Sequence, residues 1–365
     1  MSGSRSPLTV DALLSTEERA SEKSRHPEPD APRKIFSMED LFCLAEGVLR
    51  SAKVPGGTAK RVADVLVDAE ARGIASHGLV RLPSYVRRVR AGLIDIAAEP
   101  SVSRRGEGCA LVDGSNAFGV VAADLACLEV EKRARSYGVG WVTAVRSNHL
   151  SSIGYFARAL AKKELIAFMW SNAAPSVAAY NGTKPILGTN PLSIGAPRDP
   201  NPIVLDMSTS AAARGRIRRA MAEGRPIPTG WAVDRNGEST LDPAAALEGA
   251  LLPLGGAKGY GLSVFVDLLS GVLGGGASLD QVYETTENTR PADIAFTLVA
   301  ADPFQLTDRE QYAAGVESFV SRLKSSGDGS VLLPGELEDA AYARAQSDGI
   351  AVAADIIHQL EGMSL

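Results

Sequence analysis

Two histidines lie in short polar loops, where an imidazole could give or take a proton. The sequence contains four histidines, and His26 near the N-terminus and His358 near the C-terminus are the weaker candidates. His77 and His149 are each flanked by small polar residues. Histidine has an unperturbed pKa close to neutral pH, so either residue suits general acid–base catalysis. A hydrogen-bonded structural histidine is the alternative interpretation for each of them.

An arginine four residues after His77 could let the first loop bind an anion as well as move a proton. Arg81 comes just before a helix that Pro83 can start. A helix N-terminus carries partial positive charge, and a guanidinium can bind both oxygens of a carboxylate. A carboxylate anchor beside a proton carrier is what the interconversion of a 2-oxo acid and a 2-hydroxy acid requires. A surface ion pair is the alternative interpretation of Arg81.

Asp206 ends an apolar run, and the C-terminal end of a strand is a place where ligands collect in α/β proteins. Its carboxylate could orient a catalytic histidine, or it could cap the helix that follows, and the two roles are compatible. Thr189 and Asn190 lie in a Gly-Thr-Asn-Pro turn with hydroxyl and amide groups that could contact a substrate. A plain turn is the stronger local interpretation of that segment.

The glycine-rich segment around Lys258 is the best phosphate-binding candidate, because glycines let a phosphate approach the backbone and the ammonium supplies charge. The sequence contains neither the Gly-x-Gly-x-x-Gly fingerprint of classical dinucleotide-binding folds nor a Walker A motif. If a nucleotide binds, it therefore binds outside those standard arrangements.

Hydrophobic periodicity predicts an α/β protein in which short β-rich runs alternate with helices. The predicted strands are residues 109–113, 139–145, 165–170, 203–207 and 293–300. The predicted helices are residues 37–52, 58–72, 83–92, 120–136, 153–163, 258–273, 308–325 and 336–357, with an Arg-rich helix before residue 224. Order is expected to begin at Ser37, which opens a capping-box variant with Asp40, and residues 172–202 are expected to be mainly turns.

Composition limits the partners and the compartment. The 365 residues are 45% hydrophobic and 22% charged with a net charge of -5, so a large core can form and no basic excess favours nucleic acid. Three dispersed cysteines predict neither disulfides nor a metal site, and they favour the cytoplasm. No apolar run approaches the roughly 20 residues that span a bilayer, so no membrane partner is expected.

Several motifs occurring in order resemble those of the type 2 malate/L-lactate dehydrogenase family. Its relatives include ureidoglycolate and sulfolactate dehydrogenases, 2,3-diketogulonate reductase and piperideine-2-carboxylate reductase. The motifs are Ala71-Arg-Gly73, Ser76-His77-Gly78-x-x-Arg81-x-Pro83, Asn148-His149, Gly154-Tyr155, Gly188-Thr189-Asn190-Pro191-Leu192, Asp206-Met207-Ser208-Thr209-Ser210, Gly230-Trp231-Ala232-Val233-Asp234 and Lys258-Gly259-Tyr260-Gly261. The resemblance runs from about Ile35 to the C-terminus.

The resemblance implies a nicotinamide cofactor, NAD or NADP, in a fold with a non-Rossmann nucleotide-binding domain and a helical N- and C-terminal layer. It also implies a homodimer with active sites near the subunit interface. His77 matches the proton donor or acceptor of the family, and some members assign that role to the position of His149. Asp206 is expected to assist as a third catalytic residue. The candidate substrate contacts are Ser76, Arg81, Ser171, Thr189 and Asn190. The candidate cofactor contacts are Pro202, Ile203, Val204, Leu205, Asp206, Met207, Ser208, Lys258, Gly259, Gly335, Glu336 and Leu337.

The predicted organisation has four parts: a disordered tail (1–33), an N-terminal helical part (34–108), an α/β cofactor-binding part (109–300) and a C-terminal helical part (301–365). The predicted activity is reversible hydride transfer between NAD(P) and C2 of a 2-hydroxy or 2-oxo acid of the malate or lactate type. Reduction of cyclic ketimine acids and a non-catalytic nucleotide-binding scaffold are the alternatives. The cluster Arg214, Arg216, Arg218 and Arg219 could meet the 2′-phosphate of NADP or form a solvated helix face. Residues 279–288 match no motif of the family.

Overall fold

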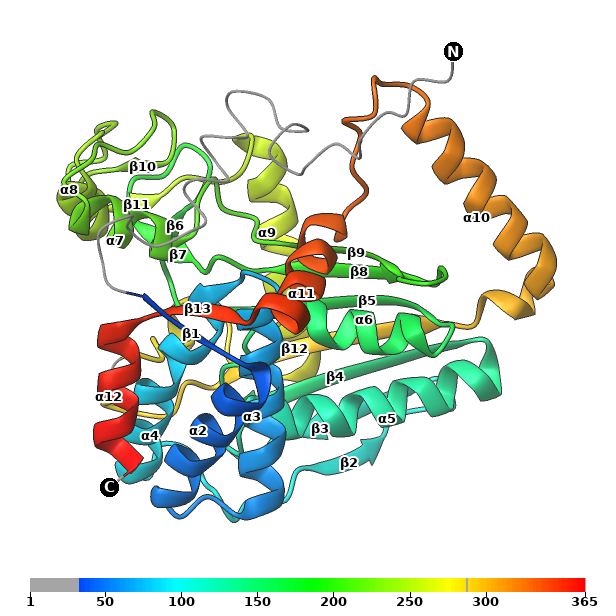
Figure 1. Cartoon of the computed structure of the whole chain (residues 1–365), viewed down its shortest axis with the longest axis horizontal. Coiled ribbons are helices and arrows are strands. Elements are labelled where there is room, and N and C mark those ends of the chain that lie inside the picture. Colours follow the sequence, from blue (N-terminus) through cyan, green and yellow to red (C-terminus); the bar gives the residue numbers. More distant parts are fainter. Residues whose placement is uncertain (1–32, 287, 365) are drawn as a thin grey trace.

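A seven-stranded sheet runs through the centre of the computed structural model, which describes residues 33–286 and 288–364 (Figure 1). Of the neighbouring pairs in this sheet, β3 and β4 run parallel and the others run antiparallel. A sheet of this kind differs from the parallel sheet of the classical dinucleotide fold. In spatial order its strands are β2 (Ser101–Arg104), β3 (Cys109–Asp113), β4 (Val139–Ser147), β12 (Ile294–Ala301), β5 (Ile166–Ser171), β8 (Leu192–Ala196) and β9 (Ile203–Met207).

Helices cover both faces of this sheet. Helices α5 (Gly119–Tyr137) and α6 (Gly154–Lys162) pack on one face, where Val142 and Ala144 of β4 join the main core. Helix α9 (Ala257–Ser270) packs on the other face, where the Thr297 hydroxyl of β12 donates to Leu269 O. The two faces differ because successive side chains of a strand point to opposite sides.

The N- and C-terminal segments form a helical layer beside the sheet, as predicted. Its helices are α2 (Met38–Ser51), α3 (Gly56–Ala71), α4 (Leu82–Arg90), α11 (Glu336–Asp348) and α12 (Ala354–Ser364). Helix α12 packs against α2 and α4, while α11 packs against α3. Ser37 and Asp40 form the capping box that starts α2, which confirms the predicted start of this helix.

A smaller four-stranded sheet lies beside the first, next to two helices (Figure 1). Its strands, in order, are β10 (Ala232–Val233), β11 (Ala250–Leu251), β6 (Val177–Ala178) and β7 (Pro185–Leu187). The neighbouring helices are α7 (Arg214–Ala222), which is the Arg-rich helix, and α8 (Pro243–Glu248). Helix α10 (Arg309–Lys324) stands away from the rest of the molecule (Figure 1).

Three predictions of local structure were wrong. The predicted helix 336–357 is interrupted by strand β13 (Ile350–Ala353), because Gly349 has a φ of +80° and a Cβ there would lie 2.8 Å from Phe36 O. Order begins before Ser37, because β1 (Arg33–Phe36) pairs with β13. The segment predicted as turns contains β6, β7 and β8: β6 pairs with β7 and with the distant β11, and β8 pairs with β5. The predicted tail lies outside the described residues except for Arg33, and the four-part division stays a prediction.

The described helices include none with the length and apolar character needed to cross a bilayer.

Candidate active site

The turn that carries His77 leads directly into α4. It consists of two short 3₁₀ segments, η2 (Ala75–His77) and η3 (Leu79–Arg81). The Arg81 side chain folds back, and its Nε donates to Ser76 O at 2.7 Å. The Ser76 hydroxyl lies 2.9 Å from His77 Nδ1. Ser76, His77 and Arg81, which the sequence places in one motif, are therefore parts of one hydrogen-bonded turn at the start of a helix.

The loop between β4 and α6 brings the second histidine to the first. The His77 and His149 rings are stacked, with centroids 5.7 Å apart and planes at 20°. The Ser151 hydroxyl donates to His77 O at 2.6 Å, so it ties the two loops together. Gly119 at the start of α5 makes room for this loop, because a Cβ there would lie 2.6 Å from His149 O.

Tyr85, one helical turn after Arg81, is a site residue that the sequence analysis missed. Its hydroxyl lies 2.7 Å from His149 Nδ1, and its side chain is only 2% exposed. Because the Ser151 N–H also donates to this nitrogen, Nδ1 acts as the acceptor and the Tyr85 hydroxyl as a donor. Neutral His149 then carries its proton on Nε2. The i, i+4 spacing of Arg81 and Tyr85 was the available signal, since residues so spaced share a helix face.

The site keeps both imidazoles neutral at physiological pH. Burial, and then the charge of Arg81, lowers the pKa of His77 to about 3. The pKa of His149 also lies well below its usual value because of burial, Arg81 and His77. Burial raises the pKa of Tyr85 and lowers that of Arg81. Both rings are therefore neutral but weakly basic, and they hold a proton only when a nearby anion raises their pKa.

Asp206 connects the end of β9 to the second histidine loop. Its Oδ2 accepts from the Ser152 hydroxyl at 2.6 Å and from Gly154 N at 2.9 Å. The helix held by this carboxylate is α6, whereas α7, which follows Asp206, has Ala213 at its N-cap and no side-chain cap. Although part of the side chain is exposed, the confined position of the carboxylate raises its pKa. Among the described hydrogen bonds of Asp206, none goes to an imidazole, so its effect on His149 passes through the loop of residues 148–153.

The other candidate substrate contacts face inward. The Asn190 side chain is 0% exposed, and its Nδ2 donates to Ser263 O at 3.0 Å and to Asp267 Oδ2 at 3.2 Å. The Ser171 hydroxyl donates to Asn172 O at 3.0 Å. Thr189 accepts the Thr209 N–H through its carbonyl oxygen. These residues support the turn beside β9, and their contact with a substrate stays a prediction.

The candidate cofactor segments lie along β9 and the turn that follows it. Val204 N donates to Pro334 O at 3.1 Å, and Gly335 lies so close that a Cβ would be 2.9 Å from Val204 O. A Cβ on Gly259 would lie 2.8 Å from Thr209 O. Pro202–Ser208, Lys258-Gly259 and Gly335–Leu337 therefore line one edge of the sheet. The exposed Lys258 ammonium suits a phosphate group, so these segments fit a dinucleotide. Glu336 instead binds Lys324 and the Leu333 N–H.

The Arg-rich helix α7 lies on the substrate side of the site. A Cβ on Gly215 would be 3.6 Å from Ser76 Cβ, and Arg218 is close enough to lower the pKa of Arg81. Arg214 Nη1 lies 3.7 Å from Glu284 Oε2. The negative charge of Glu284 also raises the pKa of Arg81. Residues 279–288, which match no motif of the family, therefore contribute Glu284 to the surroundings of Arg81. The sequence alone did not indicate this contact.

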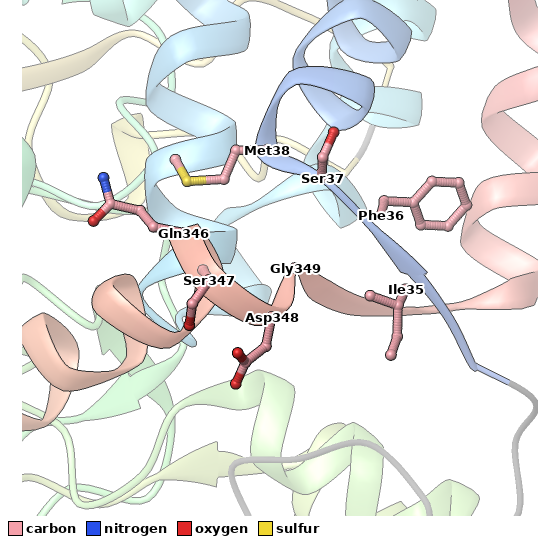
Figure 2. A pocket seen from close by; sticks show the side chains of 9 residues that line it. Ile35, Phe36, Ser37, Met38, Gln346, Ser347, Asp348 and Gly349 are labelled. Carbon is pink, nitrogen blue, oxygen red and sulfur yellow. The ribbon is translucent and has the colours of Figure 1, made fainter.

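The groove in Figure 2 is separate from this chemistry. It has a volume of about 470 Å³ and lies between β1 and the turn from α11 to β13. Ile35, Met38, Gln346 and Asp348 are among its lining residues, and none of the candidate site residues is. Within the described residues, no cluster of histidine, cysteine or acidic side chains is arranged to hold a metal ion.

Comparison with known proteins gives the family. Residues 36–361 match the sequence pattern of the malate/L-lactate dehydrogenase family. The chain is 36% identical to the L-sulfolactate dehydrogenase of Methanothermobacter thermautotrophicus over 329 residues, which cover 90% of this chain and 96% of that protein. It is 34% identical over 323 residues to a Delta(1)-pyrroline-2-carboxylate/Delta(1)-piperideine-2-carboxylate reductase of Pseudomonas aeruginosa, covering 87% of this chain and 95% of that protein. The crystal structure of a dehydrogenase from Sinorhizobium meliloti superposes with a TM-score of 0.86 at 32% identity, covering 92% of this chain and 99% of that one.

Proposed function

The chain belongs to the malate/L-lactate dehydrogenase family, and from this premise we propose that it interconverts a small 2-oxo acid and the corresponding 2-hydroxy acid with a nicotinamide cofactor. The stacked His77 and His149 rings beside Arg81 are the observation that carries the proposal. They combine a proton carrier with a carboxylate anchor in one site.

Arg81 holds the substrate through its carboxylate. Its Nε is used in the bond to Ser76 O, so the terminal Nη groups are the ones that bind the ligand. The planar guanidinium fixes the orientation of the acid because two parallel hydrogen bonds define a plane. The neighbouring C2 oxygen then lies within reach of an imidazole.

His77 moves the proton at the C2 oxygen, and His149 is the alternative carrier. In the oxidative direction neutral His77 accepts the proton of the hydroxyl. In the reductive direction the bound carboxylate favours the protonated imidazole, because a nearby anion raises the pKa of histidine. Tyr85 keeps His149 in the tautomer with its proton on Nε2. Asp206 assists by fixing the start of α6 behind the second loop.

The nicotinamide, when bound, supplies or takes up a hydride at C2. Pro202–Ser208, Lys258-Gly259 and Gly335–Leu337 would hold this cofactor, since Gly335 lies beside β9 and Gly259 beside the turn that follows it. NAD and NADP remain alternatives. The nearness of α7 to Ser76 and Arg81 favours a role of Arg218 toward the substrate over binding of a 2′-phosphate.

Positive charge near Arg81 supports a substrate with a second anionic group. Glu284 has the larger and opposite effect on Arg81, but its carboxylate is paired with Arg214. Arg218 adds positive charge, so an extra anion on the acid would be attracted to both Arg81 and Arg218. We therefore place malate-type acids ahead of lactate-type acids. The similarity to a cyclic imine reductase keeps ketimine acids as a second candidate.

A homodimer is proposed on the exposed face of α9. Large apolar side chains gather there, with Leu262 46%, Phe265 63% and Leu268 43% exposed. An apolar surface of this kind is typical of protein interfaces. Cytoplasmic localisation stays a prediction from the cysteine pattern.

A panel assay tests the proposed function. Purified protein is titrated with NADH and with NADPH, and then assayed with oxaloacetate, sulfopyruvate, pyruvate and piperideine-2-carboxylate. We expect cofactor oxidation with at least one dianionic 2-oxo acid and a weaker rate with pyruvate. Binding of a cofactor without turnover of any acid would favour the scaffold alternative.

A further inference from the structure

A half-buried carboxylate lies beneath the turn that carries His77. Glu70 is in the last turn of α3, and its Oε2 accepts the backbone N–H of Leu79 at 2.9 Å. Leu79 lies between His77 and Arg81 in the chain. The bond therefore joins α3 to the middle of the turn that presents both of these side chains.

Gly78 and Glu70 fit one another closely. A Cβ on Gly78 would lie 1.9 Å from Glu70 Oε2 and 2.9 Å from its Cδ. The space that the Glu70 carboxylate occupies therefore excludes a side chain at residue 78. The missing side chain of Gly78 is what lets the carboxylate reach the Leu79 N–H.

The carboxylate has few partners for such a confined place. Burial raises the pKa of Glu70 to about 7, while the Leu79 N–H and the charge of Arg33 oppose this shift. Withdrawing a carboxyl group from water is unfavourable unless a hydrogen bond compensates it. An apolar side chain at residue 70 would pack in this place equally well. The presence of a carboxylate oxygen that accepts the Leu79 N–H therefore needs a separate explanation.

Three of the side-chain hydrogen bonds to the backbone of the turn come from different elements. Glu70 of α3 accepts the Leu79 N–H. Arg81, at the start of α4, donates to Ser76 O, and Ser151 of the second loop donates to His77 O. The last two come from the site itself, whereas Glu70 is anchored in a helix of the terminal layer.

We propose that Glu70 is a positioning residue, whose hydrogen bond to the Leu79 N–H sets the orientation of His77 and Arg81 in the site. It touches neither substrate nor cofactor. The inference deepens the proposed function and rests on it for its kinetic consequences, but the geometry of the turn can be measured without any substrate.

Kinetic measurements compare three variants of Glu70. Glu70→Gln keeps an acceptor oxygen, Glu70→Met keeps the bulk without it, and Glu70→Ala removes both. We expect kcat/KM for the 2-oxo acid to fall about 10- to 100-fold in the Met and Ala variants, because a buried N–H loses its partner. We expect Glu70→Gln to stay within about threefold of the wild type and cofactor affinity to be unchanged in all three. Asp64→Ala, an exposed acid on the same helix, is the matched control.

A double-mutant cycle tests the fit between Gly78 and Glu70. Gly78→Ala alone should impair kcat/KM as strongly as Glu70→Ala, because the new Cβ displaces the carboxylate. In the Glu70→Ala background the same change should cost much less, since only the Cβ of residue 70 remains nearby, at 3.3 Å. Additive losses would overturn the proposed pairing.

Nitrogen-15 NMR of the histidine rings separates this inference from the proposed function. The His77 ring signals should shift in the Met and Ala variants and stay at the wild-type position in Glu70→Gln, with no substrate present. Unmoved His77 signals in Glu70→Met and Glu70→Ala would overturn the inference even if the enzyme is active. Shifted signals together with a wild-type protein that turns over no 2-oxo acid would support it while removing the proposed function. If kcat/KM of Glu70→Gln is as low as that of Glu70→Met, the hydrogen bond to the Leu79 N–H does not position the site, and the inference is overturned.

Discussion

His77 and His149 stack with ring centroids 5.7 Å apart, although the first belongs to the turn before α4 and the second to the loop after β4. Stacking of two imidazoles is compatible with a shared proton but not with two positive charges, because like charges in a confined site repel. Burial, and then the charge of Arg81, lowers the pKa of both rings, and His77 lowers that of His149 further. We therefore propose that the pair acts as one proton carrier, which burial and Arg81 keep neutral until an anion binds.

Replacing Tyr85 with phenylalanine should slow the reaction without unfolding the protein. The variant loses the hydroxyl that donates to His149 Nδ1, while the Ser151 N–H remains on that nitrogen. We expect kcat to fall about tenfold and KM to change less, since a neutral hydrogen bond contributes about 1 kcal/mol. Tyr180→Phe, at an exposed position, is the control. Steady-state kinetics with an unchanged kcat for Tyr85→Phe would show that the hydroxyl has no part in catalysis.

Replacing Arg81 with lysine should weaken substrate binding selectively. Lysine provides neither the planar pair of donors for a carboxylate nor the Nε bond to Ser76 O. We expect KM for the 2-oxo acid to rise about 10- to 100-fold, with the dissociation constant of the cofactor nearly unchanged. The exposed Arg50→Lys serves for comparison. A KM equal to that of the wild type would mean that the carboxylate binds elsewhere.

The depressed pKa of His77 makes the protein less stable in acid. His77 has a pKa of about 3 in the fold and 6.5 when unperturbed, so between these values the unfolded chain binds the extra proton. The free energy of unfolding should therefore fall as the pH drops below 6.5, by about 2 kcal/mol at pH 4.5 from this residue. The raised pKa of Glu70 has the opposite sign and cancels when wild type and His77→Gln are compared. Urea denaturation from pH 7 to pH 4.5 should show a smaller loss in His77→Gln, and parallel curves would contradict the prediction.

Removing the Asp206 carboxylate should loosen the start of α6. Asp206→Ala deprives the Ser152 hydroxyl and Gly154 N of their acceptor, which should lower the free energy of unfolding by about 1 kcal/mol. Activity should fall as well, because the same loop carries His149. Asp206→Asn retains an acceptor oxygen and should lose less of both. Equal stability of the wild type and Asp206→Ala in urea denaturation would show that this cap does not hold the helix.

The sequence predicted those site residues whose chemistry is visible in the residue type and its immediate neighbours. His77, Arg81 and Pro83 stand together in the chain, and the capping box of Ser37 is local as well. Strands β3 and β9 have the bounds that hydrophobic runs indicate. In these cases a few consecutive residues decide the structure.

The missed features depend on partners far away in the chain. Nothing local marks Glu70 as the acceptor for Leu79 N, and nothing in residues 279–288 indicates that Glu284 approaches Arg81. Strand β13 looks helical because it is alanine-rich, yet Gly349 and pairing with β1 make it extended. At β13, pairing with a distant strand overrode the local propensity for helix.

Transfer of deuterium from a nicotinamide cofactor deuterated at both C4 positions to the 2-oxo acid tests the central claim most directly. The product of the wild-type protein, examined by NMR, should carry one deuterium at C2, and the rate of its formation should fall about 10²- to 10⁴-fold in His77→Gln. A product without deuterium at C2, or deuterium transfer at the wild-type rate in both His77→Gln and His149→Gln, would contradict the account.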